Sequence, residues 1–350
     1  MKAFEKNIRK VEPYVPGEQP QRKVIKLNTN ENPYQPAPGV SKALLSMDMD
    51  RLRLYPDPTA GNLVHTLAEY YGVKDEQVFV GVGSDDVLAM CFLTFFNSEK
   101  PILFPDITYS FYKVWAELYR IPYECPKLDD DFRLVKEDYY KENGGIIFPN
   151  PNAPTGIYEE LDFIEDILKH NQDVIVIVDE AYIDFASSES LLKELDQYPN
   201  LIVLQTFSKA WGCAAIRLGM AFASPEIIAV FNKIKYPYNV NRLTQEEAIK
   251  ILQHPETVKE WVNTLLEERA RVMEAFVKLP CCIRVFPTDA NFFLAKVYEA
   301  TQIYDYLVSE GIIVRNRTNV MLCKDCLRIT IGTKEENDAL LEALGKVEIE

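Results

Sequence analysis

A lysine and an arginine stand eight residues apart in the stretch 206–219, directly after an apolar run. Residues 201–205 predict a short buried strand, so Lys209 lies beyond the carboxyl end of that strand, where open α/β sheets bind ligands. Apolar neighbours would partly desolvate this lysine and favour the neutral amine that Schiff-base chemistry needs. Ser208 and Arg217 are residue types that bind phosphate. On these residues alone, a solvated surface lysine is the alternative interpretation.

A carboxylate follows a second apolar strand. Residues 174–178 are five consecutive β-branched residues, which is typical of a strand buried on both faces in a parallel sheet. Asp179 comes next, and Tyr182 follows three residues later. A carboxylate at a dry strand end is costly without a positive partner, so Asp179 indicates a cationic group on the ligand. The alternative is that Asp179 caps a turn.

Two further segments supply residues suited to a bound anion and a flat ring. Residues 78–86 predict a strand, a glycine turn and a helix start, and backbone N–H groups at such a helix start can point at an anion. Tyr109 is a candidate to stack on an aromatic ring. Tyr112 stands three residues later, and the alternative is that both tyrosines pack into the core from one helix face.

In this order the segments resemble the motifs of fold type I pyridoxal-phosphate (PLP) aminotransferases, and residues 27–33 (LNTNENP) resemble the opening of the histidinol-phosphate subgroup. The resemblance implies three catalytic residues: Lys209 binds PLP covalently, Asp179 pairs with its pyridine nitrogen, and Tyr182 faces its phenolic oxygen. It also implies that Tyr55 reaches the cofactor phosphate of the partner subunit. Further cofactor contacts are implied for Ser84, Asp85, Tyr109, Ser208 and Arg217.

The loop 149–156 departs from the family at one position. The family motif N-P-x-N-P-T-G places its second asparagine against the phenolic oxygen, but Ala153 occupies that position here. We expect Asn152, one residue away, to substitute through a shifted backbone. The substrate-binding residues that the resemblance implies are Arg328, Arg315 and Asn30.

The elements that must position these residues alternate between strand and helix along the chain. They predict an α/β fold of the fold type I PLP-transferase class, with a mostly parallel sheet between helices in a large domain, residues 28–254. Residues 1–27 and 255–350 are assigned to a smaller α+β domain. Thr244 opens a segment with capping-box spacing, which predicts a helix from there to about His254.

The composition limits the class of protein. With 350 residues, 47% hydrophobic and 26% charged, the chain is long enough for one large domain and a smaller one. Acidic residues outnumber basic ones by 53 to 38, which disfavours nucleic acid or an anionic membrane as a partner. The N-terminus lacks a signal-peptide core, and no run approaches roughly eighteen apolar residues, so we expect a cytoplasmic protein.

The cysteines and histidines do not indicate a metal centre. Seven cysteines without framework spacing fit a reducing compartment. Cys323 and Cys326 form a lone CxxC pair, and Cys281 with Cys282 could complete four zinc ligands, but neither pair belongs to a recognisable zinc module. The three histidines are scattered outside every motif, so we predict no metal.

The resemblance further implies the reaction of L-histidinol phosphate with 2-oxoglutarate, giving imidazole-acetol phosphate and glutamate in histidine biosynthesis, by a homodimer. A threonine-phosphate decarboxylase and an aromatic amino acid aminotransferase have nearly the same motifs and are alternatives. A non-enzymatic PLP-binding effector module is an alternative of another class. Such modules usually adjoin a DNA-binding region, and the chain has no basic helix-turn-helix pattern.

Overall fold

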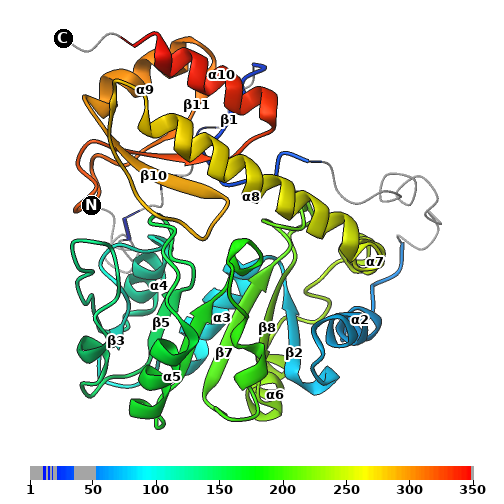
Figure 1. Cartoon of the computed structure of the whole chain (residues 1–350). Coiled ribbons are helices and arrows are strands. Elements are labelled where there is room, and N and C mark those ends of the chain that lie inside the picture. Colours follow the sequence, from blue (N-terminus) through cyan, green and yellow to red (C-terminus); the bar gives the residue numbers. More distant parts are fainter. Residues whose placement is uncertain (1–10, 13–14, 16–17, 19–21, 35–52, 348–350) are drawn as a thin grey trace, which may run out of the picture.

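The main feature of the computed structural model, which describes residues 11–12, 15, 18, 22–34 and 53–347, is a seven-stranded sheet in the lower half of Figure 1. The strand order is β2-β8-β7-β6-β5-β3-β4. β8 runs antiparallel to both neighbours, while β7, β6, β5, β3 and β4 pair in parallel, so the prediction of a mostly parallel sheet is confirmed. The strands are β2 (Val78–Gly81), β3 (Ile102–Leu103), β4 (Tyr123–Glu124), β5 (Ile146–Pro149), β6 (Val176–Asp179), β7 (Leu201–Thr206) and β8 (Gly219–Ala223).

Helices cover both faces of this sheet. Side chains alternate between the two faces along a strand, so Ile177 packs in the cluster that holds α3, α4 and α6, whereas Val176 and Val178 pack in the cluster that holds α2 and α5. All three β6 residues are fully buried, as their continuous β-branched run predicts. The helices are α2 (Gly61–Tyr71), α3 (Ser84–Phe95), α4 (Phe111–Tyr119), α5 (Leu161–His170) and α6 (Pro225–Ile234).

The parallel strands end together at one edge. In the register of β5, β6 and β7, Pro149 lies beside Asp179, and Asp179 lies beside Leu204. β7 ends at Thr206, so the turn that carries Lys209 begins at the same edge. This is the edge at which open α/β sheets bind their ligands.

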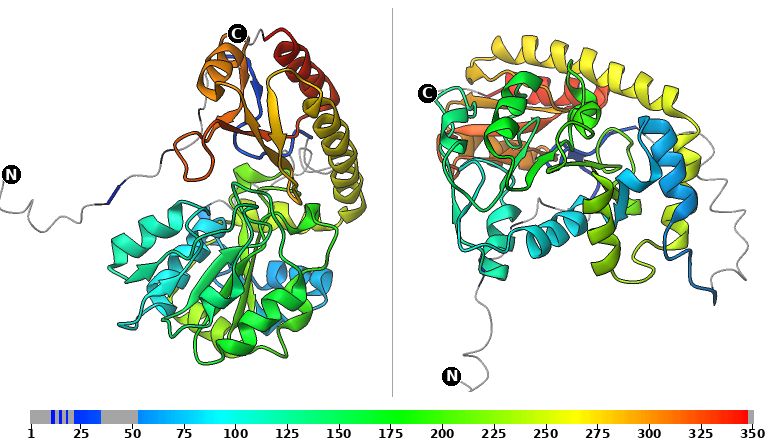
Figure 2. Two further views of the ribbon diagram at one scale, coloured as in Figure 1. Left: turned by 60° about the vertical axis from the view of Figure 1, so that its left-hand side comes forward. Right: turned by 90° about the horizontal axis from the view of Figure 1, so that it is seen from below.

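A second, smaller layer lies over that edge (Figures 1 and 2). It holds a four-stranded sheet in the order β12-β13-β10-β9 and a parallel pair of β1 with β11, which ties the N-terminal segment to the C-terminal part of the chain. The division between residues 254 and 255 stays a prediction. The elements are β1 (Ile25–Lys26), β9 (Cys282–Val285), β10 (Phe292–Val297), β11 (Ile312–Ile313), β12 (Arg315–Asn316), β13 (Cys326–Thr330), α8 (Pro255–Val277), α9 (Ala300–Ser309) and α10 (Lys334–Gly345).

The start of helix α7 (Arg242–Leu252) differs from the prediction. Asn241 is the N-cap, because its side-chain oxygen accepts a hydrogen bond from the backbone N–H of Thr244 at 2.9 Å. Thr244 therefore lies inside the first turn, and the predicted start there is wrong. Its hydroxyl donates instead to the Ile216 carbonyl at 2.8 Å, which fixes α7 to the segment before Arg217.

Among the residues that the structure describes, no helix is long and apolar enough to cross a bilayer. Within the same residues, no cluster of three or more histidine, cysteine or acidic side chains is arranged to hold a metal ion.

Candidate functional site

A pocket opens at the carboxyl edge of β6 and β7. Segments far apart in the sequence meet there: the start of α3, the segment before α4, and the turns after β5, β6 and β7. Its lining residues are Ser84, Asp85, Leu88, Tyr109, Pro149, Ala153, Asp179, Ala181, Tyr182, Thr206, Ser208, Lys209 and Arg217. Most of the residues predicted to bind the cofactor are therefore brought together.

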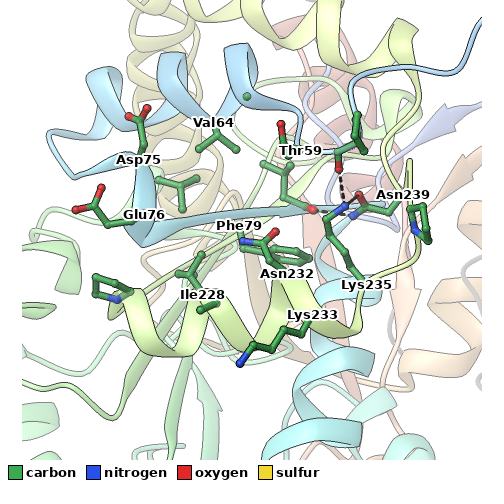
Figure 3. A pocket seen from close by; sticks show the side chains of 17 residues that line it. Thr59, Val64, Asp75, Glu76, Phe79, Ile228, Asn232, Lys233, Lys235 and Asn239 are labelled. Carbon is green, nitrogen blue, oxygen red and sulfur yellow. Dashed lines mark hydrogen bonds between the residues drawn. The ribbon is translucent and has the colours of Figure 1, made fainter.

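A larger hollow lies elsewhere, along β2 and α6, with a volume of about 710 Å³ (Figure 3). Lys235 donates there to the Pro58 carbonyl and to the Asn239 side chain, as Figure 3 shows. None of the residues singled out for chemistry lines this hollow. We therefore place the candidate site at Lys209.

Lys209 is half-buried on a turn held by aromatic packing. The Phe207 and Trp211 rings on either side stack with their centroids 4.8 Å apart, and both are fully buried. The Lys209 Nζ donates to the Thr29 carbonyl at 3.2 Å and lies 5.4 Å from the centroid of the Tyr182 ring. Packing on both sides of the turn thus directs the amine into the pocket.

Asp179 is a buried carboxylate with two hydrogen-bond donors. The Tyr112 hydroxyl donates to Oδ2 at 3.0 Å, and the Ala181 backbone N–H donates to Oδ1 at 3.2 Å. Burial raises the pKa of Asp179 to about 6, although both hydrogen bonds and the charge of Lys209 act in the opposite direction. A cation placed against Asp179 would therefore stabilise the ionised form of its carboxylate.

Tyr112 is a site residue whose role the sequence did not reveal. Its ring is fully buried, as the core-packing alternative proposed, but its hydroxyl is bonded to Asp179. The signal that could have found it is the three-residue spacing from Tyr109, because the Tyr112 backbone N–H donates to the Tyr109 carbonyl at 3.1 Å in a turn that brings the two rings together. Tyr109 donates to Asp85 at 2.8 Å and meets the Tyr112 ring edge to face.

A cradle for an anion lies on the other side of the pocket. The N-terminus of α3 begins at Ser84, and Arg217 lies against Gly83, where a Cβ atom would stand 2.6 Å from its guanidinium. A Cβ on Gly219 would stand 2.1 Å from the Ser84 backbone nitrogen. Arg217 also approaches Ser208 Oγ at 3.5 Å. Two glycines thus keep free the space in which backbone N–H groups and a guanidinium converge.

Asn152 is buried in the loop after β5. Its amide nitrogen donates to the Ile107 carbonyl at 2.9 Å and to the Thr155 hydroxyl at 3.0 Å, and its oxygen accepts from Thr108 at 3.1 Å. Ala153, and not Asn152, lines the pocket. The expected contact between Asn152 and a cofactor stays a prediction.

Asn30 lies behind the pocket and connects it to the small sheet. Its amide donates to the Tyr182 hydroxyl at 2.9 Å, and its side-chain oxygen accepts from the Thr330 hydroxyl at 3.0 Å. The Asn291 amide donates to the Asn30 carbonyl at 3.1 Å. The residue is buried and adopts the left-handed conformation with φ of 56°. Asn30 therefore fixes the orientation of Tyr182.

Besides Asn152 and Asn30, three further predicted residues do not line this pocket. Arg328, on β13, is buried and donates to the Asn28 carbonyl at 2.8 Å. Arg315 on β12 lies opposite Arg328 on β13 in the register of these two strands. Its guanidinium donates to the Val15 carbonyl at 2.8 Å. Tyr55 is 77% exposed and stacks on Tyr238 with ring centroids 4.5 Å apart. Their predicted roles remain untested by this geometry.

The fold and the pocket are those of the α/β proteins that bind PLP. A comparison of the sequence with family models agrees with this assignment. Residues 22–344 match the family "Aminotransferase class I and II", and the chain belongs to this family. A histidinol-phosphate aminotransferase of Bacteroides thetaiotaomicron is 45% identical over 348 residues, which cover 97% of this chain and 96% of that protein.

Two solved structures have the same fold. The histidinol-phosphate aminotransferase of Clostridium acetobutylicum superimposes with a TM-score of 0.84 at 25% identity, over 91% of this chain and 98% of that one. The enzyme of the same name from Sinorhizobium meliloti, solved in complex with pyridoxal-5'-phosphate, gives a TM-score of 0.84 at 24% identity, over 93% of this chain and 91% of that one.

Proposed function

We propose that this protein is a PLP-dependent aminotransferase that moves the amino group of L-histidinol phosphate to 2-oxoglutarate, giving imidazole-acetol phosphate and glutamate. The observation that carries the proposal is the convergence of an amine (Lys209), a buried carboxylate (Asp179) and a guanidinium (Arg217) on one pocket. The substrate is supported by the 45% identical relative named histidinol-phosphate aminotransferase, which this chain matches over nearly its full length.

The residues fit PLP, which has a phosphate, a phenolic oxygen and a pyridine nitrogen that accepts a proton. The phosphate would be held by the N-terminus of α3 at Ser84, by Ser208 and by Arg217. Tyr109 would stack on the pyridine ring. Asp179 would hold a proton on the pyridine nitrogen. When bound, PLP supplies an electron sink for the bonds at the substrate α-carbon.

The residues of the chain supply the proton transfers. Lys209 would hold PLP covalently and then, once displaced by the substrate amine, move a proton away from the substrate α-carbon. Tyr182 would donate to the phenolic oxygen, since Asn30 fixes its hydroxyl from the other side. Asn152 would reach the same oxygen after a shift of its loop.

Binding of the substrate is assigned to the small sheet and to a second subunit. Arg328 would bind the carboxylate of glutamate and the phosphate ester in turn, because a guanidinium pairs with both groups. Arg315 would bind the substrate phosphate, with Asn30 near the mouth of the site. We place Tyr55 of the partner subunit at the cofactor phosphate, which makes the enzyme a homodimer, and we locate it in the cytoplasm.

The first test is a half-reaction without an amino acceptor. Purified protein receives L-histidinol phosphate, and the visible absorbance of lysine-bound PLP is followed. We expect that absorbance to disappear with formation of pyridoxamine phosphate, more slowly with phenylalanine, and not at all in Lys209→Ala. Rapid turnover of phenylalanine would favour an aromatic aminotransferase. Release of CO₂ from threonine phosphate, with histidinol phosphate inert, would establish the decarboxylase, and a protein that binds no PLP would contradict the proposal.

A further inference from the structure

Cys323 and Cys326 form a close dithiol that the proposed reaction does not use. The Cys326 backbone N–H donates to the Cys323 carbonyl at 2.9 Å, which closes a β-turn immediately before β13. The ends of a β-turn lie within about 7 Å of each other, and disulfides join residues whose Cα atoms are roughly 4.4–6.8 Å apart. The two thiols interact with each other, and the Cys326 thiol donates to the Lys324 carbonyl at 3.7 Å. The pair is therefore within reach of a disulfide.

The dithiol is buried where the two layers of the molecule meet. Both cysteines are fully buried in a small apolar cluster, separate from the main core. Ile107, Leu128 and Ile157 enter this cluster from the loops that follow β3, β4 and β5 of the large sheet, and Leu294 enters it from β10 of the small sheet. Met321 (58%) and Leu322 (47%), directly before the pair in the sequence, are exposed. The buried pair therefore adjoins a segment at the surface.

One strand connects the dithiol to the candidate site. Cys326, Arg328 and Thr330 share one face of β13, because strand residues two apart point the same way. The Arg328 guanidinium donates a hydrogen bond to the Asn28 carbonyl. The Thr330 hydroxyl donates to the side-chain oxygen of Asn30, and the Asn30 amide donates to the Tyr182 hydroxyl. A displacement at the start of β13 therefore reaches the residues that orient Tyr182.

The cofactor side of the site is connected as well. Ile107 packs in the dithiol cluster, and its carbonyl accepts the Asn152 amide at 2.9 Å. Tyr109, two residues further along, lines the pocket. Both walls of the site are thus within a few residues of the apolar cluster around the dithiol.

We propose that Cys323 and Cys326 are a redox-active pair, that a peroxide oxidises them to an intramolecular disulfide, and that this disulfide lowers activity by displacing β13. The disulfide does not depend on the proposed function, whereas its effect on substrate binding rests on it. Covalently bonded sulfurs lie closer together than hydrogen-bonded thiols, so oxidation pulls the turn and the first residue of β13 together.

The chemistry balances with hydrogen peroxide as the oxidant. The Cys323 thiolate attacks one peroxide oxygen, an S–O bond forms, the O–O bond breaks, and the leaving hydroxide takes up the thiol proton as water. Cys326 then attacks this sulfur, the S–S bond forms, and the S–O bond breaks with release of a second water. Two thiols lose two electrons, and one peroxide becomes two waters.

Cys323 is the attacking thiol. The hydrogen bond from Cys326 lowers the pKa of Cys323 despite the opposing effect of burial, and the charge of Arg317 lowers it further. The same hydrogen bond and burial raise the pKa of Cys326. The thiolate therefore forms first at Cys323, and Cys326 is the resolving thiol.

The test begins with the purified holoenzyme and hydrogen peroxide. After treatment, free thiols are blocked with N-ethylmaleimide under denaturing conditions, and peptides are mapped by mass spectrometry. We expect a Cys323–Cys326 disulfide, no such bond with the bulkier oxidised glutathione, and a fall in kcat/KM for L-histidinol phosphate of about tenfold, which dithiothreitol reverses. We expect the variants Cys323→Ser and Cys326→Ser to resist this inactivation. The control Cys282→Ser removes a more accessible thiol and should be inactivated like the unmodified enzyme.

Two results would overturn the inference. If both thiols remain free for alkylation at peroxide levels that oxidise Cys282, the pair is not redox-active, and this holds whatever reaction the enzyme performs. If the disulfide forms quantitatively but kcat/KM is unchanged, the coupling to the site is wrong. A failure of the proposed function is distinct from both, since it appears in the reduced enzyme before any oxidant is added.

Discussion

At the scale of single residues, the Tyr112 hydroxyl on helix α4 opposes the effect that burial has on the protonation of Asp179. Asp179 must be ionised to hold a proton on the cofactor nitrogen, and its pKa of about 6 means that ionisation is lost as the pH falls through that value. PLP affinity should therefore decrease below about pH 6. The Tyr112 hydroxyl holds this pKa down by donating to the carboxylate.

Tyr112→Phe should shift this pH dependence upwards. Without the donor the carboxylate pKa rises, so the fall in PLP affinity begins at higher pH, and affinity at pH 7 drops by roughly tenfold, since a hydrogen bond to a charged group contributes about 1.5–3 kcal/mol. PLP titrations of the apoenzyme across pH measure the effect. Tyr123→Phe, whose hydroxyl donates to the distant Glu117, is the control. An unchanged pH profile in Tyr112→Phe would show that Tyr112 only fills space.

At the scale of elements, the close approach of β8 to the start of α3 builds the anion cradle. Gly219→Ala would place a Cβ 2.1 Å from the Ser84 nitrogen and 2.3 Å from the Gly83 carbonyl carbon, both backbone atoms. We expect the start of α3 to move, PLP affinity to fall at least about tenfold, and stability to fall by about 1–3 kcal/mol. Gly345→Ala, with nothing within 4 Å, is the matched control. Urea denaturation measures the stability of both variants, and PLP titration measures their affinity for PLP. Equal stability and equal affinity in the two variants would refute the tight contact.

At the scale of the whole molecule, the exposed Tyr55 distinguishes a dimeric site from a monomeric one. Tyr55→Phe keeps the stacking on Tyr238 but loses the hydroxyl proposed to reach the partner's phosphate. Mixed dimers of Tyr55→Phe with Lys209→Ala should recover activity, because one site then combines an intact lysine with an intact tyrosine. Random pairing would restore about a quarter of the sites. If mixing recovers nothing while mixed dimers form, Tyr55 acts within its own subunit or not at all.

The sequence by itself predicted the fold class and eight residues that line the pocket, namely Ser84, Asp85, Tyr109, Asp179, Tyr182, Ser208, Lys209 and Arg217. Asp179 and Lys209 could be identified because each directly follows an apolar strand, and parallel strands bring such positions to one edge whatever the details of packing. The antiparallel β8 was not predicted, because a short run of small and apolar residues does not by itself indicate which strands it pairs with or in which direction. The start of α7 was misplaced, since Asn241 and Thr244 both suit a cap and only the surrounding contacts choose between them.

Contacts between distant segments were decided only in the tertiary structure. The bond from Tyr112 to Asp179 spans 67 residues, and the bond from Thr330 to Asn30 spans 300. The same is true of the apolar cluster that buries Cys323 and Cys326 between the two layers. Local patterns report how a segment folds and which face it buries. Which polar group meets which across the core depends on the packing of all elements at once, and for that reason the partners of the site residues appeared only in the folded molecule.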